Sequence, residues 1–209
     1  MANSFKTAVL AIAILSVFTG CNSRELDPDS YMTYYEKNHG SLIKSKELDE
    51  LVFEADLIPH DVLALRELNT DNNGRIDKSQ FAAAYGNYKN AWYFGFRIKA
   101  SETGGSLKKI IHSKENNAKI RQYMASAIKE DFSIEIDSKK INCGLINVET
   151  DLSMQDAFLF IMSFDKPASA AYPGKDITLI YKDNIFQNGI LKFRFSSEQL
   201  NDFPKIKVI

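Results

Sequence analysis

Hydrophobic and polar residues alternate along several stretches of the chain, and this two-residue period predicts β-strands with one buried face. The alternating or strand-rich stretches cover residues 51–58, 92–99, 132–137, 141–148, 177–181 and 191–195. Residues 157–164 are apolar on both faces, which is typical of a central strand, so we expect the core to be centred there. Asn188-Gly189 predicts a two-residue hairpin, because both central residues of a type I′ turn need a positive φ.

A longer hydrophobic period predicts helices in the first half of the chain. Pro59 begins a short helix, where its missing N–H removes no intrahelical bond. After a polar loop, a second short helix is expected from Lys78 to between residues 85 and 88. A longer helix is expected from Glu115 to Lys129, with Ser113 as its N-cap.

The order of these elements predicts the fold class. Six or seven strands joined mostly by short turns favour an antiparallel sheet, mainly in the C-terminal half. Two or three helices from the first half are expected to cover one face of that sheet, which is an α+β architecture. Because each half is too small to bury a good core alone, we expect a single domain over residues 31–209.

The N-terminus has a different pattern. Lys6 precedes an uncharged apolar run over residues 8–18, which is shorter than the roughly 20 residues that span a bilayer. This arrangement is typical of a secretory signal peptide. The run ends in Phe18-Thr19-Gly20-Cys21, which resembles the lipobox of bacterial lipoproteins. An ordinary secretion signal or a buried first helix is the alternative.

The resemblance implies that residues 1–20 are a lipoprotein signal peptide, removed by cleavage before Cys21, and that the Cys21 sulfur carries lipid. The residues that follow Cys21, up to residue 30, are mostly polar and include Pro28. Residues 21–30 are therefore expected to be the lipidated cysteine and a tether. The membrane is then a partner through the anchor at Cys21. We expect an exported protein anchored in the cell envelope, in the outer membrane of a Gram-negative bacterium.

Composition and charge narrow the function classes. The 209 residues are 44% hydrophobic and 25% charged, and the net charge is −1, so there is no basic field to hold nucleic acid. With Cys21 lipidated, Cys143 stands alone and no intramolecular disulfide forms. Cys143 lies in the apolar pattern of its strand and is expected to be a small buried side chain.

One polar segment contains candidate metal ligands. Residues 69–80 read NTDNNGRIDKSQ, which resembles the twelve-residue calcium loop of the EF-hand family. Alternate residues of such a loop supply the oxygen ligands that calcium prefers, and the sixth position is a glycine, here Gly74. The resemblance implies an EF-hand-like helix–loop–helix over residues 59–88. The implied ligands are Asn69, Asp71, Asn73, the Arg75 carbonyl, Asp77 and Gln80.

The loop departs from the family pattern at both ends. Asn69 stands where the family has Asp, and Gln80 stands where it has a bidentate Glu. Since only Asp71 and Asp77 balance the metal charge, the expected dissociation constant is about 10⁻⁴ to 10⁻³ M. In the alternative interpretation no metal binds: Asp77 caps the second helix, forms a capping box with Gln80, and the loop is a connector.

Motifs for other chemistry are missing from the sequence. There is no G-x-S-x-G, P-loop or G-x-G-x-x-G motif, and the three histidines are far apart. We therefore expect no cofactor apart from calcium. We expect that the protein is not an enzyme and that it is a lipid-anchored binding or accessory module of the cell envelope. An envelope hydrolase with a site assembled from distant residues is the alternative. The expected partner is an envelope protein or a glycan, and Tyr31, Tyr34 and Tyr35 form either a docking patch or helix packing.

Overall fold

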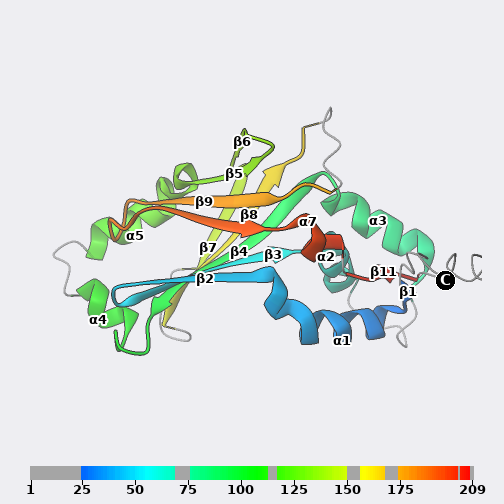
Figure 1. The fold of residues 1–209 in the computed structure, drawn as a ribbon, viewed down its shortest axis with the longest axis horizontal. Helices are drawn as coiled ribbons and strands as arrows, with labels where there is room; N and C mark the ends of the chain where they lie inside the picture. The colour runs from blue at the N-terminus through cyan, green and yellow to red at the C-terminus, as the bar shows by residue number, and fades with distance from the viewer. Residues whose placement is uncertain are drawn as a thin grey trace, which may run out of the picture.

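The computed structural model describes residues 25–68, 76–112, 117–149, 156–167, 174–201 and 203–207. Figure 1 confirms the α+β class, with long antiparallel strands in the middle and helices outside them. The predicted single sheet is replaced by two larger sheets, and a two-stranded pair lies near the chain ends. Within the described ranges, no helix is long and apolar enough to cross a bilayer.

The larger sheet has five antiparallel strands in the order β2-β3-β4-β8-β7. The strands are β2 Ile43–Leu48, β3 Leu51–Ile58, β4 Ala91–Ala100, β7 Leu145–Glu149 and β8 Ala157–Asp165. On β3 the residues with odd numbers face inward and are buried, which is the face that the alternating sequence predicted.

The smaller sheet has four antiparallel strands in the order β10-β9-β5-β6. The strands are β5 Phe132–Ile136, β6 Lys139–Asn142, β9 Ile177–Asp183 and β10 Gly189–Phe195. On β10, Leu191, Phe193 and Phe195 are buried whereas Lys192 and Arg194 are exposed, as the alternation predicted.

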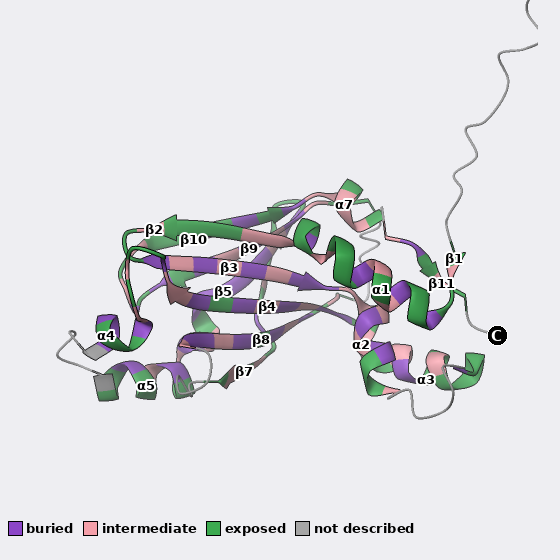
Figure 2. Cartoon of the chain, turned by 90° about the horizontal axis from the view of Figure 1, so that it is seen from below, coloured by how far each residue is buried: buried purple, intermediate pink, exposed green. Residues whose placement is uncertain are grey.

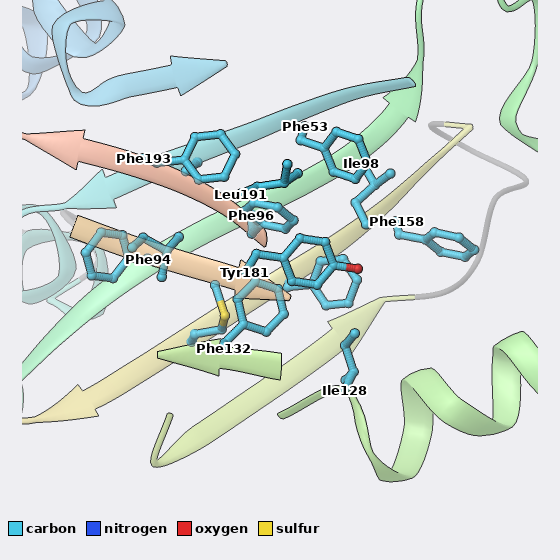
Figure 3. Packing of buried hydrophobic residues seen from close by; sticks show 14 of the residues in the cluster. Phe53, Phe94, Phe96, Ile98, Ile128, Phe132, Phe158, Tyr181, Leu191 and Phe193 are labelled. Atoms are coloured by element: carbon cyan, nitrogen blue, oxygen red, sulfur yellow. The ribbon is translucent and has the colours of Figure 1, made fainter. Parts of the chain in front are cut away.

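The two sheets pack face to face, and aromatic rings from both fill the space between them (Figure 3). Phe96 of β4 lies in the middle: its ring centroid is 5.1 Å from that of Phe132, 5.0 Å from Tyr181 and 5.6 Å from Phe193. Phe158, Phe160, Met162 and Phe164 of β8 belong to the same core, so residues 157–164 lie within it as predicted, next to β4, the middle strand of the larger sheet. β8 is an interior strand, but only its inner face is buried, and Ile161 on the other face is 48% exposed.

The helices lie at the two ends of the sheet pair and do not cover one sheet face, as Figures 1 and 2 show. The reason is that each sheet already buries its inner face against the other sheet. One end carries α4 Leu107–His112, α5 Asn117–Ser126 and the 3₁₀ helix η2 Ile128–Asp131. The other end carries α1 Pro28–Asn38, the 3₁₀ helix η1 His39–Leu42, α2 His60–Glu67, α3 Lys78–Tyr88 and α7 Ser197–Asn201.

The predicted helix over residues 115–129 is shorter in the structure. α5 ends at Ser126 and is followed by η2, whereas α4 was not predicted. Ser113, the predicted N-cap, lies outside the described residues.

The stretch predicted as one strand over residues 141–148 forms parts of two strands, β6 and β7, because the chain changes sheets in its middle. The backbone N–H of Cys143 donates to Phe132 O of the smaller sheet at 3.2 Å, and the N–H of Gly144 donates to Ser163 O of the larger sheet at 2.9 Å. Cys143 is buried between the sheets, as predicted. An apolar pattern alone does not show which sheet completes the hydrogen bonds of each half of the stretch.

The hairpin between β9 and β10 is confirmed, but the two-residue turn is not. Gly189 pairs with Asp183, so the connection holds five residues, and positive φ occurs at Gln187 and Gly189, not at Asn188. The buried Asp183 carboxylate holds this loop, since it accepts hydrogen bonds from the backbone N–H groups of Ile185, Phe186 and Asn188 at 2.9–3.2 Å.

The folded structure begins before the predicted boundary at residue 31. β1 Glu25–Leu26 pairs in parallel with β11 Lys205–Ile206, and α1 follows directly with Asp27 as its N-cap. Residues 25–30 of the predicted tether therefore belong to the fold. Residues 21–24, with Cys21, and the predicted signal peptide lie outside the described residues.

Candidate functional site

A cavity of about 560 Å³ opens at the end of the sheet pair that carries α1, α2, α3 and α7. Its walls come from the ends of β3, β4 and β9, from α1, α2 and α3, and from the C-terminal segment that leads into β11. The volume is in the range of small-molecule sites, which occur where several elements meet. Six aromatic side chains line the cavity: Tyr31, Phe81, Tyr85, Trp92, Tyr93 and Phe203.

Packing against neighbouring groups orients several of these rings. Phe81 stacks on Tyr85, one turn further along α3, at 5.8 Å between centroids. The His60 ring meets Tyr85 edge-on at 6.1 Å and Tyr93 at 6.3 Å. Tyr31 is only 1% exposed and belongs to a second apolar cluster with Val62 and other residues of this end. Packing within the protein therefore fixes the orientation of these rings without a ligand.

Pro59 places two polar side chains at the cavity. Its backbone is extended, and α2 starts immediately after it, so His60 and Asp61 occupy the first helical turn. A carboxylate is favourable there because the N-terminal end of a helix carries a partial positive charge.

Asp61 is half-buried in the cavity wall. Burial raises the pKa of its carboxyl, and a hydrogen bond from its own backbone N–H opposes this shift. No cation among the described residues lies close enough to lower this pKa further. Asp61 is thus a partly desolvated acid without a basic partner in the described part of the chain.

The Tyr31 hydroxyl is buried and has no hydrogen-bond partner among the described residues. Burial raises the pKa of Tyr31, and the nearby negative charge of Asp61 adds to the shift. The pKa of Tyr85 is raised by the same two causes. Since a buried polar group without a partner costs about 1–3 kcal/mol, most such groups in proteins are paired. This end of the cavity therefore combines a lone carboxyl with an unpaired hydroxyl.

His60 and Lys166 form a second polar group beside the cavity, and here the polar atoms are paired. His60 Nε2 lies 2.5 Å from the Ala91 carbonyl oxygen and 3.1 Å from Lys166 Nζ, which also donates to Lys89 O at 2.8 Å. Burial, helped by the charge of Lys166, lowers the pKa of His60 to about 4, and burial lowers the pKa of Lys166 to about 8. At neutral pH the ring is uncharged and the lysine is mostly charged, 5.3 Å from the centroid of the Trp92 ring.

The predicted calcium ligands fall only partly within the described residues. Asn69, Asp71, Asn73 and Arg75 lie outside them. The flanking helices are as expected, since α2 and α3 bracket the loop and α3 spans Lys78–Tyr88. Over the described ranges, no three histidine, cysteine, aspartate or glutamate side chains gather as a metal site. The calcium site stays a prediction.

Asp77 caps α3, as the alternative interpretation of the loop requires. Its carboxylate accepts hydrogen bonds from the backbone N–H and the hydroxyl of Ser79, both at 2.8 Å, and these bonds lower the pKa of Asp77. The Gln80 side chain is exposed. The cap does not compete fully with calcium, because a carboxylate has several lone-pair positions.

The tyrosines of α1 pack the helix onto the rest of the fold. Tyr31 and Tyr35 are buried, and Tyr34 is half-buried with its ring 5.8 Å from Phe203. They do not form an open docking patch, but Tyr31 belongs to the cavity wall. The sequence offered no pattern for the cavity as a whole, because Tyr31, Asp61, Tyr93 and Phe203 are brought together only by tertiary packing.

Comparison of the chain with family models, curated proteins and solved structures finds no match.

Proposed function

We propose that this chain is a non-enzymatic, lipid-anchored protein of the bacterial cell envelope that binds a small ligand in the cavity beside α2 and α3. The observation that supports the proposal is the cavity, in which packed aromatic walls surround a few polar groups. Among the described residues, Asp61 has no basic partner and the Tyr31 hydroxyl has no hydrogen-bond partner. Apolar walls with a small number of polar groups are typical of binding sites.

The proposed anchor lies close to the cavity along the chain. Cys21 is four residues before Glu25, and an extended chain spans at most about 3.6 Å per residue, so this link reaches no more than about 14 Å. β1 pairs with β11, whose residues Lys205–Ile206 line the cavity. A lipid on Cys21 would therefore hold the cavity end of the domain near the membrane surface, where the protein would meet ligands of the envelope.

Ligand binding is tested with a neutral aromatic probe, N-phenyl-1-naphthylamine, whose fluorescence rises in apolar sites. Cys21→Ser protein is used because it needs no detergent. We expect saturable binding that weakens about tenfold in Tyr85→Ala, since a buried aromatic contact contributes about 0.5–1.5 kcal/mol beyond its area. Ile161→Ala, on the open face of β8 away from the cavity, is the control and should bind as the parent does. Equal affinities in all three proteins would contradict the proposal.

Lipidation is tested separately at Cys21. Replacing Cys21 by serine removes the sulfur that would carry the acyl chains, so fatty-acid labelling should disappear and the protein should leave the membrane fraction. Stable anchoring requires more than one acyl chain, each buried methylene contributing about 0.8 kcal/mol. Cys143→Ser, which changes the buried cysteine, should remain labelled and membrane-bound. A Cys21→Ser protein that stays acylated would show that the anchor is elsewhere.

Calcium binding by residues 69–80 is a second part of the proposal. A ligand that binds only the folded state stabilises it by RT ln(1 + [L]/Kd), so the melting temperature should rise with millimolar calcium. Gln80→Glu should enlarge the shift by restoring a bidentate carboxylate, and Asp71→Asn should abolish it. Asp77 is avoided because its loss also removes the cap of α3. If neither the parent nor Gln80→Glu responds to several millimolar calcium, the loop is only a connector.

A further inference from the structure

Asp61 determines which ligand chemistry suits the cavity. Removing an ionised carboxylate from water costs free energy unless a positive charge or several hydrogen-bond donors lie close to it. Burial raises the pKa of this carboxyl, only its own backbone N–H is found to oppose the shift, and no lysine or arginine of the described chain does. Lys205 lines the same cavity, but it does not lower the pKa of Asp61, so the carboxylate itself lacks a positive charge beside it.

The Tyr31 hydroxyl does not supply the partner that Asp61 lacks. It is buried without a partner among the described residues, and it lies near enough to Asp61 for the carboxylate charge to raise its pKa. Tyr31 and Asp61 both line the cavity. A hydroxyl oxygen and a carboxylate are both hydrogen-bond acceptors, and an ammonium group supplies three donors. The Tyr31 oxygen itself has almost no exposed surface, so the group that a ligand in the cavity meets is the Asp61 carboxylate, and donors on the ligand satisfy that group.

The aromatic wall supports the same chemistry. Tyr85 and Phe81 stack on each other on α3, and Tyr93 of β4 lines the same cavity. The faces of such rings attract cations and also pack against apolar bodies. The nearby cation Lys166 is already held by Lys89 O and lies over Trp92, so it does not neutralise Asp61.

We propose, on the basis of the binding function argued above, that the cavity takes an organic ammonium ion, with its charged nitrogen at Asp61 and its apolar body against the aromatic rings. A volume of about 560 Å³ accommodates an aryl- or alkylamine of drug-like size. The ligand class is thus a primary amine on an apolar body, and a neutral or anionic molecule of the same shape binds more weakly.

The test compares three probes of nearly equal size on the Cys21→Ser protein by titration calorimetry: 2-phenylethylammonium, 2-phenylethanol and phenylacetate. We expect the ammonium ion to bind at least tenfold more tightly than the alcohol, and phenylacetate to bind most weakly. In Asp61→Asn, which keeps the side-chain shape, the ammonium ion and the alcohol should bind with about equal affinity, because the preference for the ammonium ion depends on the carboxylate charge.

Two further variants separate a local effect from a general one. Glu67→Gln removes an exposed carboxylate from the same helix, and it should keep the full preference for the ammonium ion. Asp61→Glu keeps the charge and should retain a preference of several-fold. Thermal unfolding of each variant checks that the fold persists.

The outcomes distinguish the two proposals. If the neutral naphthylamine probe and the alcohol bind but the ammonium ion has no advantage, or if Asp61→Asn binds it as tightly as the parent does, the ligand class is wrong and the binding function stands. A preference for phenylacetate would also overturn the ligand class, because it would assign the cavity to anions. If no probe binds, both proposals fail.

Discussion

Phe96→Ala is expected to lower the free energy of unfolding by about 3–5 kcal/mol, the range typical of a buried phenylalanine. Phe96 is 2% exposed, and its ring meets aromatic rings from strands of both sheets, including Phe132 and Tyr181. Truncation to a methyl group would leave a cavity where the two sheets meet, and rigid rings on both sides would not close it. A loss of this size is a large part of the stability of a typical domain.

Urea denaturation followed by circular dichroism measures this loss, with the slope of the transition as a check on two-state behaviour. Ile161→Ala is the matched control: it also removes an apolar side chain from the larger sheet, but Ile161 is 48% exposed. Its expected loss is below about 1 kcal/mol. If the two variants lose similar free energies, the sheets do not share the core described here.

Asp183→Ala is expected to lower the free energy of unfolding by about 3 kcal/mol. The carboxylate is 3% exposed and accepts hydrogen bonds from three backbone N–H groups of the β9–β10 loop, from the Asn188 side chain and from the Tyr181 hydroxyl. Removing it leaves several donors unpaired, and each buried one costs about 1–3 kcal/mol, with part recovered by water.

The same denaturation experiment measures the effect of Asp183→Ala. Asp183→Asn keeps one acceptor oxygen and should lose less free energy than the alanine variant. Asp29→Ala, at an exposed position in the first turn of α1, is the control and should change the free energy of unfolding by less than about 1 kcal/mol. If Asp183→Ala leaves the free energy of unfolding nearly unchanged, other contacts hold the loop.

The elements β3, α2, α3 and β4 were predictable because their signals are local, whereas β1, α1, η1 and β2 were not predicted. The alternation over Leu51–Ile58 reproduces β3 at both ends, and Asp77 marks the start of α3. A capping side chain acts on a backbone group only two or three residues away, so a short window of sequence contains the whole interaction. The hairpin around Gly189 was found for a similar reason, but its length was not, because the buried Asp183 holds a wider loop.

The candidate site depends on contacts that no short window contains. Asp61 was not singled out, since one acid at the start of a helix is ordinary; its chemistry comes from burial among residues of other elements. The sequence leaves open whether Tyr31 docks a partner or packs α1, and the tertiary structure makes it part of the cavity wall. The sequence does not tell whether an aromatic side chain will pack against a neighbouring ring or contact a ligand.

The sequence by itself determined the α+β class, most strand positions, the burial of Cys143 and the two helices around residues 69–75, because each follows from periodicity or a local cap. Only the tertiary structure decided that the strands form two facing sheets, that the chain crosses between them at Cys143 and Gly144, and that Tyr31, Asp61 and Phe203 share one cavity. The physical reason is that strand pairing and cavity formation join residues far apart in the chain, and alternation shows which face of a strand is buried without showing what covers it.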